Sequence, residues 1–459
     1  MELNPHFRVD ERPGGAGPSV VVIGGGASGV LMALHLLRSS GTVRVMLVEK
    51  SDLLGCGIAY RTSDPGHLLN TRVSSMSAYA DHRDHFLAWL RAAVDPSACP
   101  FSFVPRGTYG QYLANTLEIA EGATRLTCVR GEAVRLSLMH SGLQVQLGDG
   151  QVLSADKVVL ATGHALPEAD AESGISVPWG DSSLPHRDAD VLLIGTGLTM
   201  VDQVMTLLDA GHRGRIEAIS RRGLLPLPHA DAPPVTISPD DLPLGRRVTD
   251  LMLWLRNRAA EVEAEGGNWR SVVDGLRPHV QKLWQAMDLD ARARFLRHAC
   301  VWWEVHRHRL PPSSAWRIEA ARSEGRLVLR RAAFLGAKRS SDNTISVRLL
   351  PTGSTMEETQ TVHHLIDCRG IRRDPERNAA PVVRQMLSDG LAKVDPLRLG
   401  ILVDDSARVL RPDGTVLQGV FAIGPVSRSA FWEITAIPDI RVQAAWLSAT
   451  LSNPYPGLR

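Results

Sequence analysis

The feature that most constrains this 459-residue chain is the run from Pro18 to Lys50. Residues 19–23 are apolar and mostly β-branched, as in a buried strand, and residues 30–37 carry apolar side chains at helical spacing. A glycine-rich turn, Gly24-Gly25-Gly26-Ala27-Ser28-Gly29, stands between them, and a second apolar run, 43–48, follows at once. This order predicts the strand–turn–helix–strand unit that binds nucleotides.

The glycines of this turn each have a physical reason. Gly24 permits a tight turn, Gly26 lets the backbone approach a pyrophosphate, and Gly29 lets helix and strand pack closely. Glu49 ends the second strand, where a carboxylate can accept hydrogen bonds from an adenosine ribose. The unit therefore predicts a dinucleotide site, which suits FAD and NAD equally. Its candidate cofactor-binding residues are Gly24, Gly26, Ala27, Ser28, Gly29 and Glu49.

A second run, from Asp190 to Ser220, repeats the pattern. Strand 191–194 is followed by Gly195-Thr196-Gly197-Leu198-Thr199-Met200, a helical segment and strand 216–220. Gly195 and Gly197 repeat the first two glycines, but Met200 replaces the third, which predicts a helix that packs less closely on its sheet. Arg221 stands after the strand end, where the first unit has an acid, and favours the 2′-phosphate of NADPH over NADH.

Composition narrows the class of protein. A hydrophobic fraction of 44% and a net charge of +2 are typical of a globular protein, and no basic run is interleaved with aromatic residues, so we expect no nucleic-acid partner. No apolar run is long enough to cross a bilayer, and the N-terminus lacks a signal sequence, so we expect no membrane attachment and a cytoplasmic location. Five scattered cysteines exclude a C-x-x-C dithiol, and we expect no metal site.

The length and the two units predict an α/β fold: two Rossmann-like dinucleotide-binding domains with an inserted helical layer. Helices are expected over 244–265 and 272–299, with a break near Asp288. The predicted divisions are a flexible leader (1–17), a first domain in two parts (18–180 and 366–459), a second domain (181–365) and the helical insert within it (240–310).

Three further stretches are candidates for function. The loop 53–79 has no regular period and is long enough to suggest a role that a bound cofactor would order. Prolines punctuate 224–241, which is therefore an ordered loop or a lid. In 300–311, His306 and His308 would share one side of a strand, and we weigh structural histidines against a substrate-facing role, with metal binding disfavoured because no third ligand is near in sequence.

The turn Ala161-Thr162-Gly163, the sequence Val420-Phe421-Ala422-Ile423-Gly424 and the two glycine turns resemble the two-dinucleotide-binding flavoproteins, which hold FAD first and NAD(P)H second. The chain is more closely similar to bacterial FAD/NAD(P)-binding proteins of the YdhS type. The stretches that carry this likeness are His67-Leu68-Leu69-Asn70, Leu198-Thr199-Met200-Val201-Asp202, Ser220-Arg221-Arg222-Gly223-Leu224-Leu225-Pro226 and Phe431-Trp432-Glu433-Ile434-Thr435-Ala436.

The resemblance implies FAD at the first unit, with contributions from Asn70, Gly163 and the Gly424 turn, and NAD(P)H at the second. Pro425 departs from the broader group, where an Asp usually meets the ribityl hydroxyls. Among the activities associated with such proteins, we favour FAD-dependent, NAD(P)H-using hydroxylation of urate, a step of purine catabolism.

The partners of that reaction would be a small-molecule substrate and O₂. Arginine would hold an anionic ring and a base would handle the proton. The alternatives are a non-catalytic flavin-based redox sensor, and an FAD-dependent oxidase or dehydrogenase. The candidate catalytic residues are Arg72, Arg428, Glu433 and His306, with Trp432, Trp303 and His308 as further candidates nearby.

Overall fold

The computed structural model describes residues 17–179, 184–370 and 374–452. The expected leader, 1–17, lies outside the described residues except for its last one. The chain divides into two compact units. Among the described residues, unit 1 comprises 17–63, 72–166 and 374–452, and unit 2 comprises 64–71, 167–179 and 184–370.

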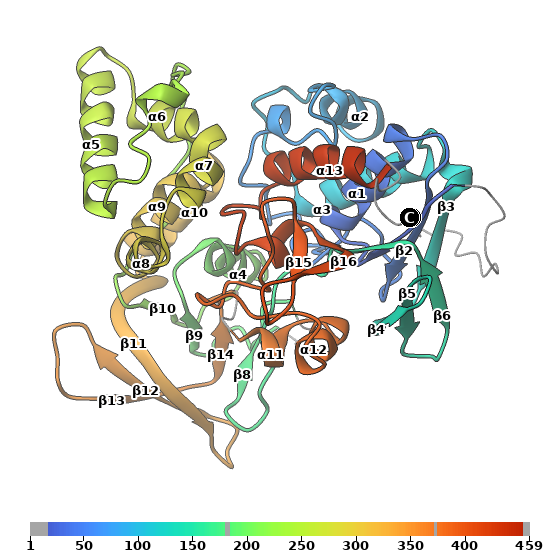
Figure 1. The fold of residues 1–459 in the computed structure, drawn as a ribbon. Coiled ribbons are helices and arrows are strands. Elements are labelled where there is room, and N and C mark those ends of the chain that lie inside the picture. The colour runs from blue at the N-terminus through green and yellow to red at the C-terminus, as the bar shows by residue number, and fades with distance from the viewer. Residues whose placement is uncertain (1–16, 180–183, 371–373, 453–459) are drawn as a thin grey trace. The chain divides into compact units, whose positions relative to one another are not determined.

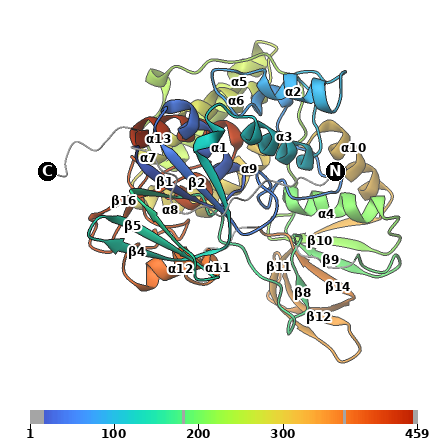
Figure 2. The same ribbon diagram turned by 90° about the vertical axis from the view of Figure 1, so that its right-hand side faces the viewer.

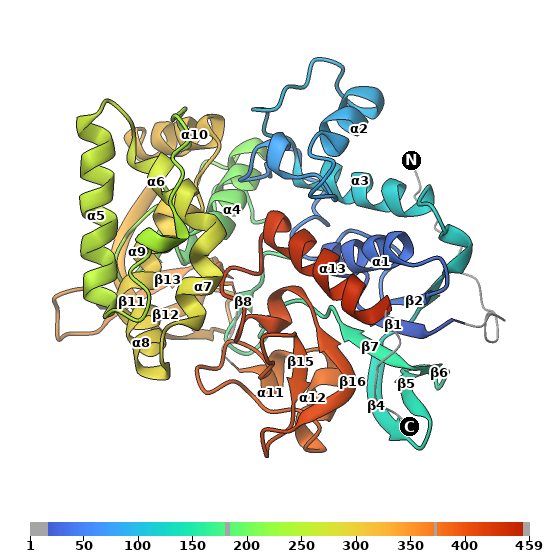
Figure 3. The same ribbon diagram turned by 45° about the horizontal axis from the view of Figure 1, so that its top comes forward.

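Unit 1 is built, in its described residues, on a six-stranded sheet of order β15-β16-β7-β1-β2-β3, parallel except for β15. Helices α1, α3 and α13 pack together, and the views show α13 alongside α1 (Figure 3). A small antiparallel sheet, β4-β5-β6, completes this unit. The strands are β1 (Ser19–Ile23), β2 (Arg44–Glu49), β3 (Leu126–Arg130), β4 (Ala133–Met139), β5 (Gly142–Leu147), β6 (Val152–Ala155), β7 (Lys157–Leu160), β15 (Arg408–Leu410) and β16 (Val416–Ala422). The helices are α1 (Ala27–Ser39), α2 (His85–Ala93), α3 (Arg106–Glu118), α11 (Pro375–Asn378), α12 (Pro381–Ser388) and α13 (Ile437–Ser452).

Unit 2 has, in the part of it that is described, a seven-stranded sheet of order β13-β12-β11-β10-β9-β14-β8. Strand β11 begins parallel to β10 and continues into an antiparallel hairpin with β12 and β13, drawn in orange in Figure 1. Helices α4 and α10 contact each other beside strands β9 and β10 (Figure 2). The strands are β8 (Ile175–Ser176), β9 (Val191–Ile194), β10 (Ile216–Ser220), β11 (Leu327–Arg339), β12 (Ile345–Pro351), β13 (Glu358–Val362) and β14 (His364–Asp367).

The helical layer of unit 2 follows the prediction, with shorter pieces than expected. Its second predicted helix is divided, and the expected break at Asp288 is where α8 begins, because the Asp288 carboxylate accepts the Ala291 N–H at 2.7 Å. The helices of unit 2 are α4 (Leu198–Asp209), α5 (Val248–Ala264), α6 (Trp269–Leu276), α7 (Val280–Gln285), α8 (Leu289–Arg294), α9 (Cys300–Arg307) and α10 (Pro312–Ser323).

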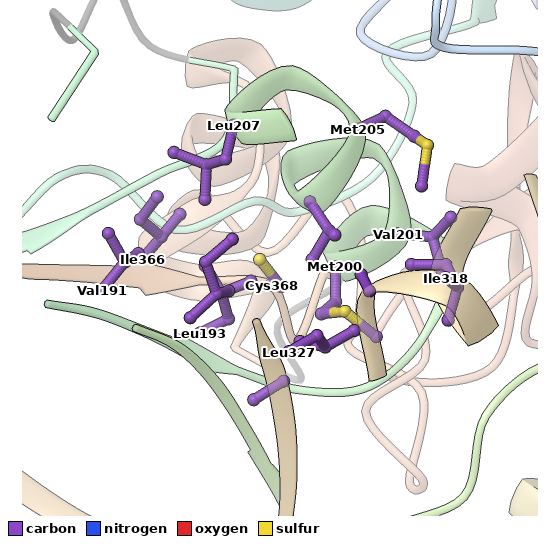
Figure 4. Close-up of a cluster of buried hydrophobic side chains, with 14 of the residues drawn as sticks. Val191, Leu193, Met200, Val201, Met205, Leu207, Ile318, Leu327, Ile366 and Cys368 are labelled. Carbon is purple, nitrogen blue, oxygen red and sulfur yellow. The ribbon is translucent and has the colours of Figure 1, made fainter. Parts of the chain in front are cut away.

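Met200 lies in the middle of the core of unit 2. It is fully buried among side chains of β9, β11 and α10, including Leu193, Leu327 and Ile318 (Figure 4). Helix α4 stands farther from β9 and β10 than α1 stands from β1 and β2. The long side chain therefore fills the space that a more distant helix leaves, as the missing third glycine predicts.

The structure corrects several expected boundaries. Strand β8 pairs with β14, so residues 167–179 belong to unit 2 rather than to the first domain ending at 180. Strand β14 pairs with β9, which keeps residues 366–370 in unit 2 as well. Residues 64–71, inside the first long loop, also cluster with unit 2. Pairing partners that are distant in sequence decide these positions, and local patterns do not reveal them.

Candidate dinucleotide sites

The glycine turn of unit 1 is as crowded as its sequence predicts. Gly24 has φ +106°, and a Cβ there would lie 2.5 Å from the Ala161 carbonyl oxygen. A Cβ at Gly29 would lie 1.8 Å from the Gly24 carbonyl oxygen. Neither position accepts a side chain without moving backbone, so the turn, β7 and the start of α1 form one closely packed corner.

The N-terminus of α1 fits a phosphate group. Gly26 is its N-cap, and no side chain in the described chain caps the first turn, which also has no acidic residue. The first N–H groups and the positive end of the helix dipole are therefore left for an anion. A Cβ at Gly26 would come 3.1 Å from Gly57, so this glycine also lets the loop after β2 approach the turn.

Glu49 lies at the end of β2, beside the same turn. Its Oε2 accepts the Gly25 N–H at 2.7 Å, and its Oε1 accepts the Ser51 N–H at 2.8 Å. Each carboxylate oxygen keeps a second lone pair, so the group can still accept hydrogen bonds from ribose hydroxyls. The two backbone contacts hold the carboxylate beside the glycine turn, and its contact with a ribose stays a prediction.

Strands β7 and β16 end side by side at this edge of the sheet, where the Ile423 N–H donates to the Leu160 carbonyl at 2.9 Å. Gly163 has φ +73°, with open space where a Cβ would point. Gly424 lies against the first turn of α1, because a Cβ there would be 2.3 Å from Ser28 Oγ. The Gly424 N–H donates to Gln443 Oε1 at 2.8 Å, so a backbone donor that replaces the Asp missing at Pro425 must come from another residue.

Arg428 and Trp432 form a stacked pair just after β16. The guanidinium carbon lies 4.2 Å from the indole centroid, and Trp432 is buried. Glu433 is also buried and has φ +65°, a strained conformation for a residue with a side chain. This segment contains two of the four predicted catalytic residues, Arg428 and Glu433.

His164 is a residue that the sequence reasoning did not select. The residue is half-buried, and loss of solvation together with the nearby Arg428 guanidinium lowers the pKa of its imidazole to about 3. The ring is therefore neutral at physiological pH and can donate one hydrogen bond and accept another. Its position directly after the Ala161–Gly163 turn was the available signal, since that turn was already expected to pass close to the cofactor.

The other predicted residues belong to other elements of the fold. Arg72 precedes a 3₁₀ turn of unit 1, and its guanidinium stacks on Phe101 at 5.1 Å. His306 belongs to unit 2, on helix α9 rather than on a strand, and its Nδ1 donates to the Trp302 carbonyl at 2.7 Å. His306 is the last residue but one of α9 and His308 is the C-cap of that helix, so the two histidines do not lie on a strand as expected.

Asn70, predicted near FAD, lies in the segment that clusters with unit 2. Its carbonyl accepts a hydrogen bond from His229 Nε2 at 3.0 Å. His67 anchors the same segment to α4, with Nε2 2.8 Å from Thr206 Oγ1 and 3.0 Å from the Asp202 carbonyl. The FAD-binding role of Asn70 stays a prediction.

The second glycine turn leads to a different strand end. Gly195 repeats the left-handed conformation of Gly24, with φ +113°, and a Cβ at Gly197 would meet open space. Thr196 Oγ1 lies 3.0 Å from Ser220 Oγ, which joins the turn to the end of β10. Arg221 is exposed at that end.

The loop 224–241 is an ordered loop tied to the helical layer. Backbone hydrogen bonds join residues 227 and 229 to 305 and 310. Side chains of the helical layer also reach it, because Arg270 donates to the Pro228 carbonyl and His279 to the Ile237 carbonyl. A free lid would lack such ties, so this segment moves, if at all, together with the helices.

The described residues show neither a metal site nor a membrane-spanning helix. In that part of the chain, no group of three or more His, Cys, Asp or Glu residues is arranged to hold a metal ion, and no helix is long and apolar enough to span a membrane. All five cysteines lie in described segments and are free thiols; Cys56 lies half-buried beside Gly110.

Comparison with known proteins agrees with this geometry. Residues 21–165 match a family model described as FAD-NAD(P)-binding. The cofactors expected from the sequence, FAD and NAD(P)H, are confirmed at this level. A search of curated proteins returned no match.

Solved structures share the fold over nearly the whole chain. The reduced ornithine hydroxylase of Pseudomonas aeruginosa is 15% identical with a TM-score of 0.62, over 95% of this chain and 99% of its own. The ornithine N-hydroxylase of Kutzneria sp. 744, solved with reduced FAD, NADP⁺ and L-ornithine, is 14% identical with a TM-score of 0.63 and the same coverage. Thioredoxin reductase of Lactococcus lactis is 15% identical with a TM-score of 0.52, again over 95% and 99%. The α/β two-unit fold predicted from the sequence is confirmed.

Proposed function

We propose that this protein is an FAD-dependent NAD(P)H oxidoreductase that acts as a monooxygenase on a small planar anionic substrate, with urate as the candidate. The observation that carries the oxidoreductase part is the presence of two nucleotide-binding units in one chain. One ends its second strand in the acid Glu49, and the other is followed by Arg221, which suits FAD at the first and NADPH at the second.

The shared fold adds support, because it is that of hydroxylases that use flavin and of thioredoxin reductase. The cysteines favour the first group. No two of the five cysteines stand in a C-x-x-C pair, and none of them forms a disulfide. Electrons taken from NAD(P)H are therefore better assigned to O₂ than to a disulfide.

Bound FAD would accept a hydride from NAD(P)H and pass the electrons to O₂. The balance is NAD(P)H, H⁺, O₂ and substrate giving NAD(P)⁺, water and a substrate with one added oxygen. The protein groups would bind and orient the substrate. The Arg428 guanidinium donates in a plane to an anionic ring, and the Trp432 indole beneath it holds that plane.

Proton handling is assigned to His164 and Glu433. The neutral imidazole of His164 can accept a hydrogen bond from a substrate N–H, whereas a protonated ring could not. Glu433 supplies a buried carboxylate in the Arg428 segment. Arg72 and His306 remain candidate catalytic residues.

Oxygen incorporation tests this function. The FAD-loaded protein is mixed with NADPH or NADH in air, together with urate, other purines or L-ornithine, and NAD(P)H loss, hydrogen peroxide and product mass are followed together. We expect urate-dependent NAD(P)H consumption and a product heavier by one oxygen atom. Peroxide formed in proportion to all NAD(P)H consumed would identify an oxidase, and flavin reduction without turnover would identify a sensor.

A pair of variants tests the substrate assignment. Arg428→Gln should raise KM for the anionic substrate roughly 10- to 100-fold, because a charge-assisted hydrogen bond is lost. Arg38→Gln is the matched control, since Arg38 forms an exposed ion pair with Asp81 at 2.6 Å and should leave KM unchanged. Equal KM values in all three proteins would remove Arg428 from the substrate site.

A further inference from the structure

The two units can be compared residue by residue at the carboxyl edges of their sheets. In unit 1, Glu49 at the end of β2 pairs with Arg130 on β3. In unit 2, Ser220 at the end of β10 pairs with Arg331 on β11. Arg130 and Arg331 therefore occupy the same place, one strand beyond the strand whose end faces the ribose of a bound dinucleotide.

The two arginines differ in whether a carboxylate lies beside them, and one nearby position decides this. Arg130 forms an ion pair with Asp52, at 2.7 Å, and Asp52 comes three residues after Glu49. The residue three after Ser220 is Gly223, with φ +63°. A Cβ at Gly223 would lie 2.8 Å from Arg331 Cγ, so the arginine side chain crosses the turn where unit 1 has its carboxylate.

Arg331 and Arg221 are both exposed, and within the described residues neither guanidinium has a hydrogen bond or an ion pair. Their neighbours are engaged. Arg330 pairs with Glu217 and Glu358, and Arg222 stacks on Trp302 at 5.7 Å. At this edge of the sheet, Arg221 and Arg331 therefore differ from the neighbouring arginines, whose side chains already have partners.

The backbone around the pair is fixed. Ser220 Oγ accepts the Gly223 N–H at 2.9 Å and holds the turn. Thr352 joins the two arginines, because its N–H donates to the Arg331 carbonyl at 2.9 Å and its hydroxyl donates to the Arg221 carbonyl at 3.0 Å. Both side chains therefore start from positions set by one residue of the β12–β13 turn.

We propose that Arg221 and Arg331 together form a site for a phosphate monoester, the 2′-phosphate of NADPH, and that Gly223 determines this specificity by leaving Arg331 without a carboxylate. The inference rests on the proposed function of unit 2 and adds to it a second phosphate ligand and a specificity position. Two guanidinium groups can each donate two hydrogen bonds to one phosphate, which NADH lacks.

Titration calorimetry of the FAD-loaded protein with NADP⁺ and NAD⁺ tests the site without turnover. Arg331→Ala should weaken NADP⁺ binding roughly 10- to 100-fold and leave NAD⁺ within about twofold, because only the phosphate contact is lost. Arg326→Ala is the matched control. Arg326 precedes the first residue of β11 and pairs with Glu324 at 2.7 Å, so its removal should change neither affinity.

A second pair of variants tests Gly223. Gly223→Asp restores the carboxylate that unit 1 has, and Gly223→Asn has the same size without the charge; both residue types tolerate positive φ better than others do. We expect Gly223→Asp to bind NADP⁺ about tenfold more weakly than Gly223→Asn, with equal NAD⁺ affinities. Adenosine 2′,5′-bisphosphate should compete better than AMP or inorganic phosphate, which separates a ribose-bound phosphate from a free anion.

The outcomes are distinguishable. If NADP⁺ binds the unaltered protein and Arg331→Ala weakens NADP⁺ and NAD⁺ equally, or neither, the two-arginine site is wrong while the proposed function stands. If neither nucleotide binds the unaltered protein at all, the assignment of unit 2 to NAD(P)H is wrong and the inference fails with it.

Discussion

The two glycine turns of this protein differ in how closely the following helix packs on its sheet. In unit 1 the third glycine, Gly29, brings α1 so close to the turn that a single added carbon would lie 1.8 Å from a backbone oxygen. In unit 2 the same position is Met200, and α4 stands farther from its strands, with the methionine filling the gap. A glycine-turn motif thus fixes the turn, while the third position sets the distance of the helix.

The largest effect on stability should come from replacing the third glycine of the unit 1 turn, Gly29, with a larger residue. Gly29→Ala places Cβ against the Gly24 carbonyl, which is backbone and cannot swing away, so α1 must move. We expect a loss of roughly 3 kcal/mol or more in the free energy of unfolding, together with loss of bound FAD. Urea unfolding and the flavin content of the purified protein measure the two quantities.

Met200→Leu is the matched change in unit 2. It conserves volume at a site already built for a long side chain and should cost less than about 1.5 kcal/mol, with FAD content unchanged. A Gly29→Ala protein as stable and as flavin-rich as Met200→Leu would refute the idea that the third position decides helix distance.

A smaller effect, on nucleotide affinity, is expected from changes at the ends of β2 and β10. Glu49 accepts two backbone N–H groups beside the first turn, whereas Ser220 contributes a hydroxyl beside the second. Hydrogen bonds to a charged group are worth about 1.5–3 kcal/mol, so Glu49→Ala should weaken FAD binding roughly 10- to 100-fold. Fluorescence titration of the apoprotein with FAD measures this.

The corresponding change in unit 2 sharpens the comparison. Ser220→Ala removes only neutral hydrogen bonds, so NADP⁺ affinity should fall by about tenfold or less and FAD affinity should not change. If Glu49→Ala altered NADP⁺ binding as strongly as FAD binding, the two strand ends would not serve separate nucleotides.

The sequence predicted most of this arrangement because its signals are local. Both turns, both strand ends and the break at Asp288 depend on residues close together in the chain. The features that it missed depend on distant partners. Strand β8 is assigned by its pairing with β14, and residues 64–71 by their contacts with α4 and His229.

The candidate site shows the same limit. The positions of Glu49 and Arg221 could be predicted from spacing, whereas the unpaired state of Arg331 could not, because it depends on the register of β10 with β11 and on the absence of a side chain at Gly223. His164 was visible in the sequence, but its position beside Arg428 is a feature of the folded chain that the sequence does not show. Residues 300–307 of the segment 300–311 form helix α9, whereas His306 and His308 were considered as residues of a strand.

The smallest expected effect is on the pH dependence of stability and concerns His164 of unit 1. There His164 follows the Ala161–Gly163 turn after β7. After β14 of unit 2, Arg369 is instead held by an ion pair with the buried Asp367, at 2.7 Å. Burial lowers the folded-state pKa of His164 to about 3, whereas the unfolded chain takes up the proton near the ordinary value of 6.5. Protons therefore favour the unfolded state as the pH falls from 6.5 towards 3.

His164→Gln removes this proton uptake, so it should lose less stability than the unaltered protein between pH 7.5 and pH 5. The difference should be on the order of 1 kcal/mol, because one pKa unit corresponds to about 1.4 kcal/mol and the ring is only partly shielded from solvent. Urea unfolding at the two pH values measures it, and NADP⁺ affinity at pH 7.5 should stay the same because unit 2 is untouched. Parallel losses in the two proteins would mean that His164 is protonated in the fold, and the neutral imidazole assigned to proton handling would have to be given up.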